Sequence, residues 1–376
     1  MSEKIEKINF PFRKHLQNFI PYSSARDEFV SNGQKYTFLD ANENPFENDE
    51  KNRYPEVMHD ELREKIVEVK TSQFSCHLEK NNIILGNGSD ELIDLLIRIF
   101  CEPKVDSICI SSPTFGMYGV SANVNNVNVI DISLNSRTFE LDDIVVDKIL
   151  LSDNTCVTIE NQNNIKLLFL CHPNNPTGNI ISEKRLLKIL DNFSGMVVVD
   201  EAYIDFSSEH STLKFLQKYP KLIVLQTFSK MWGLAGVRCG KAFAHPDVIT
   251  MLQAVKDPYN VNMLTARAVN DALNNKSTIY QKRNIILAQK LYLEDECKKL
   301  TISENPIFSE VYPSHCNSIL VRLVPELDSD IMYEKLKNKG IVVRNFGKKQ
   351  FLENCLRISV GTPEENFRVV EILRNI

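Results

Sequence analysis

An α/β fold around a mostly parallel, doubly wound sheet is the architecture that this sequence predicts. Three short apolar runs, at residues 166–171, 195–199 and 222–225, have the continuous hydrophobicity of strands buried on both faces of a parallel sheet. A stretch with helical periodicity begins at Ser182, so strand, helix and strand alternate along the chain. Polar residues stand just beyond each run. Because ligands bind beyond the carboxyl ends of the strands in such sheets, we expect the functional site there.

The size and charge of the chain limit the class of protein that it can be. The 376 residues are 43% hydrophobic and 25% charged, which is ordinary globular material and long enough for two domains. No basic face opposes the net charge of −5, so we expect a small-molecule substrate rather than nucleic acid or an anionic membrane. Residues 1–7 are charged where a signal peptide needs an apolar core, and no apolar run approaches the length of a membrane span. We therefore expect a cytoplasmic location.

The cysteines give no sign of a disulfide framework or a metal site. There are nine of them, an odd number, and the tightest separation is that between Cys101 and Cys109. Reduced and mostly buried thiols are the simplest interpretation. The pairs Cys171–His172 and His315–Cys316 do not change this, because adjacent residues on a strand point to opposite faces. We expect no metal.

Residues 1–40 are expected to form an arm that contributes to the small domain. The spacing of Phe12, Leu16 and Phe19 predicts a short amphipathic helix that ends before Pro21. Such an arm can lie on another surface.

The large domain is expected at residues 41–260 and the small α+β domain at residues 261–376. In the large domain the patterns predict helices at 60–69, from Leu92 and from Ser182, and strands at 83–85, 105–110, 166–171, 195–199 and 222–225. In the small domain they predict a helical stretch at 280–300, strands at 318–322, 341–344 and 355–361, and a helix at 331–339. Between residues 131 and 164 the signal is weak and indicates no function.

A phosphate site is one interpretation of the junction at residues 87–91. There a glycine turn joins a predicted strand to a helix, and the free N–H groups and positive dipole of a helix N-terminus bind phosphate, with Ser89 able to cap. A plain capped helix would give the same pattern, so both interpretations stay open here. Phe115 and Tyr118, further along, could stack on a planar ligand or pack in the core.

Lys230 follows directly on a predicted buried strand. Desolvation there lowers the pKa of an ammonium, and the neutral amine can then attack a carbonyl carbon. Asn175, Asp200, Tyr203 and Arg238 are expected at the same edge of the sheet. A pyridine aldehyde phosphate needs such a set: a lysine for its aldehyde, a carboxylate for its ring nitrogen, donors for its phenolate oxygen, and hydroxyl, guanidinium and backbone N–H groups for its phosphate.

The chain resembles the fold-type-I pyridoxal-phosphate aminotransferases and, within them, the histidinol-phosphate aminotransferase family. The resemblance covers nearly the whole length. It is found, in order, in LDANENPF, RYP, GNGSDELIDLL, PTFGMY, HPNNPTG, VVVDEAYIDF, SKMWGLAGVRCG, GIVVRN and LRISVGTPEEN. It implies a large domain with a mostly parallel, seven-stranded type of sheet between helices, a smaller α+β domain, and pyridoxal 5'-phosphate as cofactor.

The resemblance also implies roles for individual residues. Lys230, Asp200 and Tyr203 would be catalytic. The cofactor would further be bound by Gly88, Ser89, Asp90, Tyr118, Asn175, Ser229 and Arg238, and by Tyr54, which would reach the phosphate of the neighbouring subunit of a homodimer. The substrates would be bound by Tyr22, Asn44, Arg344 and Arg357.

The implied reaction is transamination of L-histidinol phosphate with 2-oxoglutarate, giving imidazole acetol phosphate and glutamate in histidine biosynthesis. Two arginines suit it, because a guanidinium pairs bidentately with either a phosphate or a carboxylate. An aromatic or broad-specificity aminotransferase and a phosphothreonine decarboxylase are the alternatives. A non-catalytic relative that keeps only the fold is disfavoured, because Lys230, Asp200 and Arg238 are all present. The chain departs from the family at His172, where a polar amide is commoner, and at Met231–Trp232.

Overall fold

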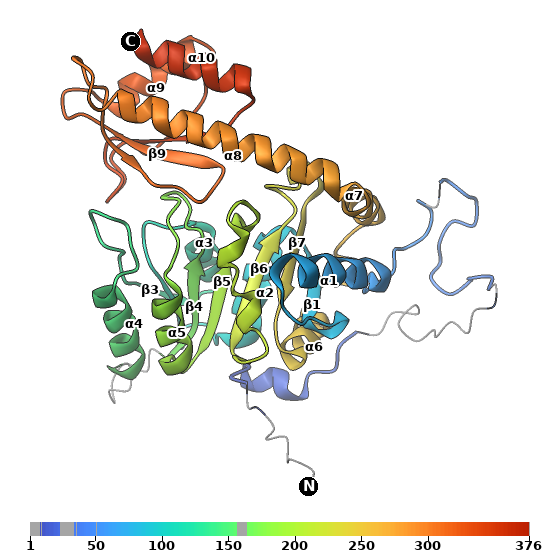
Figure 1. Ribbon diagram of the computed structural model, residues 1–376. Coiled ribbons are helices and arrows are strands. Elements are labelled where there is room, and N and C mark those ends of the chain that lie inside the picture. Colours follow the sequence, from blue (N-terminus) through green and yellow to red (C-terminus); the bar gives the residue numbers. More distant parts are fainter. Residues whose placement is uncertain are drawn as a thin grey trace.

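The computed structural model describes residues 8, 10–22, 34, 36–49, 51–155 and 164–375. They form a large domain around one sheet and a smaller domain above it, as Figure 1 shows. The predicted arm at residues 1–40 falls in part outside the described residues.

A seven-stranded sheet organises the large domain, with the strand order β1-β7-β6-β5-β4-β2-β3. Its strands are β1 (Ile83–Asn87), β2 (Asp106–Ile110), β3 (Asn128–Asp131), β4 (Asn164–Cys171), β5 (Met196–Asp200), β6 (Leu222–Thr227) and β7 (Cys239–Phe243). Only β7 runs against its neighbours, since it pairs antiparallel with both β1 and β6, whereas the pairs from β6 to β3 are parallel. The predicted mostly parallel sheet is confirmed.

Both faces of the sheet are covered, because neighbouring residues of each strand enter different cores. Val197, Val199 and Val224 belong to one core, whereas Val198 and Ile223 belong to the other. The first core is closed by α1 (Asp60–Phe74), α4 (Asp143–Thr155), α5 (Glu183–Asn192) and α7 (Met263–Asn274). The second is closed by α2 (Gly88–Phe100), α3 (Met117–Val124) and α6 (Pro246–Val255). This is the doubly wound arrangement that continuous apolar strands require.

The small domain is an antiparallel sheet covered by helices. Its strand order is β10-β11-β9-β8. Its elements are β8 (Phe308–Tyr312), β9 (Ser318–Leu323), α9 (Ser329–Asn338), β10 (Arg344–Asn345), β11 (Cys355–Ser359) and α10 (Pro363–Arg374). The long helix α8 (Lys276–Lys299) crosses from the large domain to the small one (Figure 1).

The boundary between the domains differs from the predicted one after residue 260. Val269 and Leu273 of α7 are buried in a core of the large domain, and only the second half of α8, with Leu293 and Cys297, enters the core of the small domain. The boundary therefore lies within α8. A helix pattern that continues across two domains gives no sequence signal where one core ends and the next begins.

The described part of the arm also differs from the prediction. The expected amphipathic helix is a 3-10 turn, η1 (Lys14–Asn18), and Phe19 is 44% exposed. Phe10 and Leu16 are buried against the large domain, in the core of α2 and α6, rather than contributing to the small domain. Phe12 stacks on Phe100, with ring centroids 5.1 Å apart.

Candidate active site

A cleft opens where β4, β5 and β6 end, at the edge of the sheet where the sequence places the site. It holds about 600 Å³ of empty space, part of it open to solvent. The residues that line it are Ser89, Asp90, Phe115, Cys171, Asn175, Asp200, Ala202, Tyr203, Thr227, Ser229, Lys230, Ala235 and Arg238. The predicted residues Ser89, Asp90, Asn175, Asp200, Tyr203, Ser229, Lys230 and Arg238 thus come together from five separate segments of the chain.

Lys230 lies on a closed loop that follows β6. The N–H of Leu234 donates to the carbonyl of Phe228 at 3.0 Å, and the N–H of Gly233 donates to the carbonyl of Lys230 at 3.0 Å. Gly233 permits this turn because its φ of +70° lies in the left-handed region. Partial desolvation lowers the pKa of the Lys230 ammonium, and the positive charge of Arg357 lowers it further. The lysine therefore reaches its neutral, nucleophilic form more easily than an ordinary surface lysine.

Asp200 presents a buried carboxylate at the end of β5. Its Oδ2 accepts a hydrogen bond from the Tyr118 hydroxyl at 2.7 Å, and its Oδ1 accepts one from the N–H of Ala202 at 3.1 Å. Burial raises the pKa of Asp200 to about 6. A cationic N–H placed against this carboxylate would compensate the lost hydration and favour its charged form.

The third part of the cleft is built to approach an anion closely. The N-terminus of α2 begins at Gly88, whose φ is +75° and where an added Cβ would meet Nη2 of Arg238 at 2.5 Å. A Cβ at Gly240 would meet the backbone nitrogen of Ser89 at 2.3 Å, so β7 also needs glycine to lie against this turn. Arg238 forms an ion pair with Asp90 at 3.2 Å. Helix N–H groups and a guanidinium thus converge in one place.

The predicted capping role of Ser89 is wrong. The helix begins one residue earlier, Asn87 is its N-cap, and no side chain caps it through a hydrogen bond. No side-chain cap therefore uses the first N–H groups of α2, although the N–H of Gly88 donates to the carbonyl of Arg238 at 3.1 Å.

Arg357 brings the small domain to the cleft. It lies on β11, and its guanidinium donates a hydrogen bond to Oδ1 of Asn175. Arg344 is its direct partner on the antiparallel strand β10, so both predicted substrate arginines share one face of the small sheet. Arg344 itself is exposed, 5.9 Å from the ring of Phe346.

Tyr118 is not placed as the resemblance implies. It has no exposed surface and stacks on Phe169, with ring centroids 4.9 Å apart. Its hydroxyl donates to Asp200, and Phe115 lines the cleft instead. Both rings follow the same strand, and the sequence alone does not say which one faces the ligand.

Tyr22, Asn44 and Tyr54 do not line the cleft of their own chain. Tyr22 is 75% exposed and Tyr54 is 52% exposed. Asn44 is exposed, with its Oδ1 accepting a hydrogen bond from the N–H of Phe46 at 3.0 Å. Tyr54 stacks on Tyr259, with ring centroids 4.6 Å apart.

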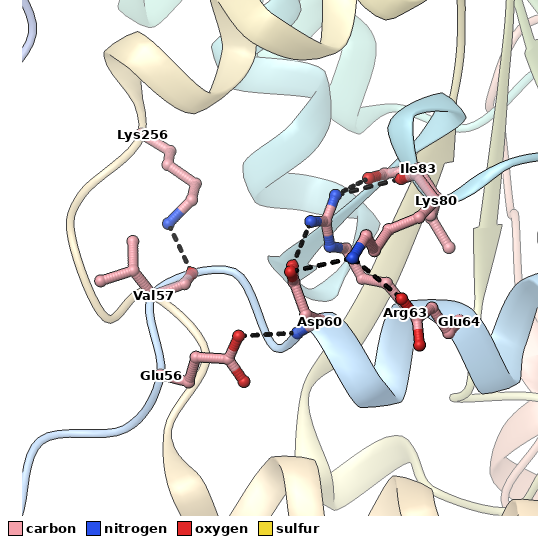
Figure 2. A network of polar contacts seen from close by, with 8 residues as sticks. All are labelled: Glu56, Val57, Asp60, Arg63, Glu64, Lys80, Ile83 and Lys256. Carbon is pink, nitrogen blue, oxygen red and sulfur yellow. Dashed lines mark hydrogen bonds and ion pairs between the residues drawn. The ribbon is translucent and has the colours of Figure 1, made fainter. Parts of the chain in front are cut away.

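A polar network fixes the segment that follows Tyr54, as Figure 2 shows. Nζ of Lys256 donates to the carbonyl of Val57 at 3.3 Å. The N–H of Asp60 donates to Glu56 at 3.0 Å, and the Asp60 carboxylate bridges Arg63 at 2.5 Å and Lys80 at 3.0 Å. The chain therefore enters α1 in a fixed direction, with Tyr54 turned outward.

The two departures from the family lie outside the cleft. His172 is buried, accepts a hydrogen bond from the N–H of Ile181 at 3.0 Å on Nδ1, and donates from Nε2 to the carbonyl of His210 at 3.0 Å. Burial lowers the pKa of His172 to about 4, so it is neutral near pH 7. Trp232 is 3% exposed and does not line the cleft.

Thr227 lines the cleft although the sequence reasoning did not single it out. It is the last residue of β6, and its hydroxyl accepts a hydrogen bond from the N–H of Ser229 at 3.1 Å. The sequence signal that could have identified Thr227 is a polar residue at the end of an apolar strand. Among the residues that the structure describes, no group of three or more His, Cys, Asp or Glu side chains could hold a metal ion, and no helix is long and apolar enough to cross a membrane.

Comparisons with known proteins point to one family. Residues 34–373 match the model of the family described as aminotransferase class I and II. The histidinol-phosphate aminotransferase of Parabacteroides distasonis is 45% identical over 364 residues, which cover 97% of this chain and 97% of that protein. The crystal structure of the histidinol-phosphate aminotransferase from Clostridium acetobutylicum has a TM-score of 0.74 at 20% identity, covering 87% of this chain and 91% of that one. That of the Sinorhizobium meliloti enzyme, in complex with pyridoxal-5'-phosphate, has a TM-score of 0.71 at 18% identity, covering 87% and 84%.

Proposed function

The chain belongs to the class I and II aminotransferase family, in its histidinol-phosphate aminotransferase group, and we propose that it transfers the amino group of L-histidinol phosphate to 2-oxoglutarate. The products are imidazole acetol phosphate and glutamate, and the reaction belongs to histidine biosynthesis. The structural observation that supports this most is one cleft that joins Lys230 and Asp200 to Arg357 of the other domain.

The residues of the cleft fit pyridoxal 5'-phosphate. Because Gly88 has no side chain, the Arg238 guanidinium can lie against the α2 N-terminus. The guanidinium and the helix N-terminus together suit a phosphate, and Ser229 lines the same cleft. The buried Asp200 carboxylate suits a protonated ring nitrogen, and Tyr203 and Asn175, which line the same cleft, would serve the phenolate oxygen. When bound, this cofactor supplies an electron sink for the carbon that loses its proton.

Lys230 is the group that we expect to move that proton. Its Nζ is held 5.2 Å from the centre of the Tyr203 ring and has a lowered pKa. In its neutral form it would take the proton from Cα of the amine substrate and later return it, acting as base and then as acid. Asp200, held by Tyr118 and by the N–H of Ala202, would keep its carboxylate aimed at the ring nitrogen.

Arg344 and Arg357 are the residues that we expect to recognise both substrates. Histidinol phosphate offers a phosphate, whereas glutamate and 2-oxoglutarate offer carboxylates, and a guanidinium can pair bidentately with either. Tyr22 and Asn44 would complete this side of the site from the arm and from the turn-rich stretch before α1. Asn175 lines the cleft and accepts a hydrogen bond from Arg357, so the proposed cofactor site and the proposed substrate site share this residue.

We also propose a homodimer in which Tyr54 reaches the cofactor phosphate of the partner. Its exposure and its stacking on Tyr259 support this arrangement, as does the anchored segment after it, which Figure 2 shows. A cytoplasmic location, which we also propose, is supported by free, mostly buried thiols among the described cysteines.

A cofactor test comes first. The purified protein should be yellow, and borohydride should leave a pyridoxyl group on Lys230. A colourless protein that cannot be loaded would refute the whole proposal.

A substrate test then separates the related activities. Single-turnover spectra of the loaded enzyme with histidinol phosphate, phenylalanine and phosphothreonine should show the fastest conversion with histidinol phosphate. A clear preference for phenylalanine would indicate an aromatic aminotransferase, and release of carbon dioxide from phosphothreonine would indicate a decarboxylase.

A further inference from the structure

A cluster of buried charged and aromatic side chains lies directly behind the loop of Lys230. Lys70 comes from α1, Asp205 from the 3-10 turn η3 (Ile204–Phe206), Trp232 from the loop itself and Lys241 from β7. All four are at most 5% exposed. Charged side chains are almost never this deeply buried unless they are paired, so the cluster calls for an explanation.

Asp205 is the centre of the cluster. Its Oδ1 accepts hydrogen bonds from Nζ of Lys70 at 2.8 Å and from Nε2 of Gln73 at 2.9 Å, and its Oδ2 accepts one from Nε1 of Trp232 at 3.1 Å. Burial opposes the charge of Asp205, but the ammonium groups of Lys70 and Lys241 hold its pKa below the ordinary value. The indole N–H therefore donates to a charged acceptor, which makes a stronger bond than a neutral one.

This bond joins two segments that line the cleft. Asp205 stands two residues after Tyr203, and Trp232 stands two residues after Lys230. The hydrogen bond between them thus fixes the Lys230 loop to the segment that carries Tyr203.

The other side of Lys230 is fixed as well. Phe228, two residues before it, lies under Nζ of Lys241, which is 3.9 Å from the ring centre. Phe228 also meets Trp232 edge to face, with centroids 5.5 Å apart. The loop needs such anchors, because nothing within 4 Å would meet a Cβ added at Gly233 or Gly236.

We propose that Asp205 and Trp232 are positioning residues that hold the Lys230 amine at a fixed place relative to Tyr203, and so relative to the carbon from which it takes a proton. The inference rests on the proposed function, in which Lys230 carries that proton. Small displacements of a proton-transferring group lower rates strongly, whereas substrate binding through distant contacts is unaffected. A cluster that only stabilised the fold would change the melting temperature and leave the chemistry of the folded enzyme unchanged.

Trp232→Phe is the first test. It removes the indole N–H but keeps an aromatic ring and leaves the Lys70–Asp205 ion pair intact. In the folded, loaded enzyme we expect kcat of the amine half-reaction to fall about tenfold with less than about a twofold change in KM. The pH midpoint of the visible absorbance of the loaded enzyme should shift. In the cofactor-free enzyme, the pH midpoint for modification of Lys230 by trinitrobenzenesulfonate should shift too, because the amine changes its surroundings.

Tyr280→Leu is the matched control. Tyr280 packs against the Trp232 ring, with centroids 6.2 Å apart, but takes no part in the hydrogen bond to Asp205. We expect it to leave kcat and both pH midpoints as in the wild type. Equal effects of Trp232→Phe and Tyr280→Leu would overturn the proposal, because packing alone would then explain them.

Fluorescence gives a second, independent measurement. Trp232 is the sole tryptophan of the chain, so tryptophan emission, excited where tyrosine does not absorb, reports on this cluster alone. The double variant Lys70→Met/Asp205→Asn removes both charges of the ion pair without leaving Lys70 unpaired, and should make the indole at least about twofold more accessible to acrylamide as its anchor weakens. Unchanged quenching would overturn the proposal even if Trp232→Phe does not fold. Neither the quenching nor the modification of Lys230 needs a substrate, so a wrong assignment of the substrate would leave these results standing.

Discussion

The two sides of the cleft are built in different ways. On the side of Lys230 and Asp200, the functional groups stand at the ends of adjacent strands of one sheet, and Asp200 is buried and doubly hydrogen-bonded. In the proposed function, the substrate side is instead formed by Arg344 and Arg357 of the small domain and by the exposed Tyr22 of the arm, none of which lines the cleft. One side is fixed by β-sheet geometry, and the other is assembled from separate parts.

This difference separates the chemistry from the choice of substrate. Spacing between strand ends is set by backbone hydrogen bonds, so the groups that we propose to handle the proton cannot move independently. Arg357 contacts the cleft through its hydrogen bond to Asn175, and the N–H of His315 donates to the carbonyl of Gly178 at 2.7 Å as a further contact between the domains. Changes in substrate can therefore be made on one side without rebuilding the other.

Lys230→Ala should have the largest effect. Without the amine that moves the proton, we expect kcat to fall by about 10⁴-fold. The variant should still bind pyridoxal 5'-phosphate weakly, because Arg238, Ser229 and the α2 N-terminus remain. Turnover and equilibrium dialysis measure the two quantities. Residual turnover above about one per cent of wild type would mean that another base shares this role.

Lys241→Met should show what it costs in stability to bury a lysine behind the Lys230 loop. Lys241 is fully buried, its Nζ has no hydrogen-bond partner, and burial lowers its pKa from 10.5 to about 7. Because the unfolded chain holds the proton between these two values, the wild type should gain stability as pH rises from about 7 to 10.5, by on the order of 5 kcal/mol in all.

The methionine variant should lose this pH dependence and be more stable than the wild type near pH 7. Urea unfolding at pH 7 and pH 10 checks this, provided the transition is two-state. A gain from Lys241→Met that was equally large at both pH values would contradict it.

Gly240→Ala should break the packing between β7 and the α2 N-terminus. The added Cβ would meet backbone atoms of Gly88 and Ser89 at 2.3–2.4 Å, and backbone cannot give way as a flexible side chain can. We expect a loss of about 3 kcal/mol in stability and weaker cofactor binding. Gly236→Ala is the matched control, since its Cβ would meet nothing within 4 Å. Similar effects of the two substitutions would refute the special role of Gly240.

The same difference explains what the sequence could predict. Asn175, Asp200, Tyr203 and Lys230 follow continuous apolar strands, and parallel strands bring such ends together whatever lies between them. Their meeting in one cleft therefore followed from local patterns alone. β7 was missed because its sequence, CGKAF, contains the glycine and the buried lysine that this position needs instead of an apolar run.

Other features depend on packing that no local pattern records. Phe115 and Tyr118 are both aromatic and only three residues apart, yet Phe115 lines the cleft and Tyr118 is buried, with its hydroxyl donating to Asp200. The pairing of Trp232 with Asp205 joins segments 27 residues apart in the chain, and neither residue stands in the cleft. Which ring faces the cleft and which residues pair are determined by tertiary packing.

Arg357→Lys should have the smallest of these effects and tests the assembled side most directly. A lysine keeps the positive charge but loses the planar fork that can bind a phosphate or a carboxylate through two parallel hydrogen bonds. We expect KM for both histidinol phosphate and 2-oxoglutarate to rise about tenfold, with kcat changed less than about twofold. Lys349→Arg, an exposed change in the same domain, serves as the control. A fall in kcat with unchanged KM values would show that Arg357 acts on the chemistry through Asn175, so that the two sides are not independent after all.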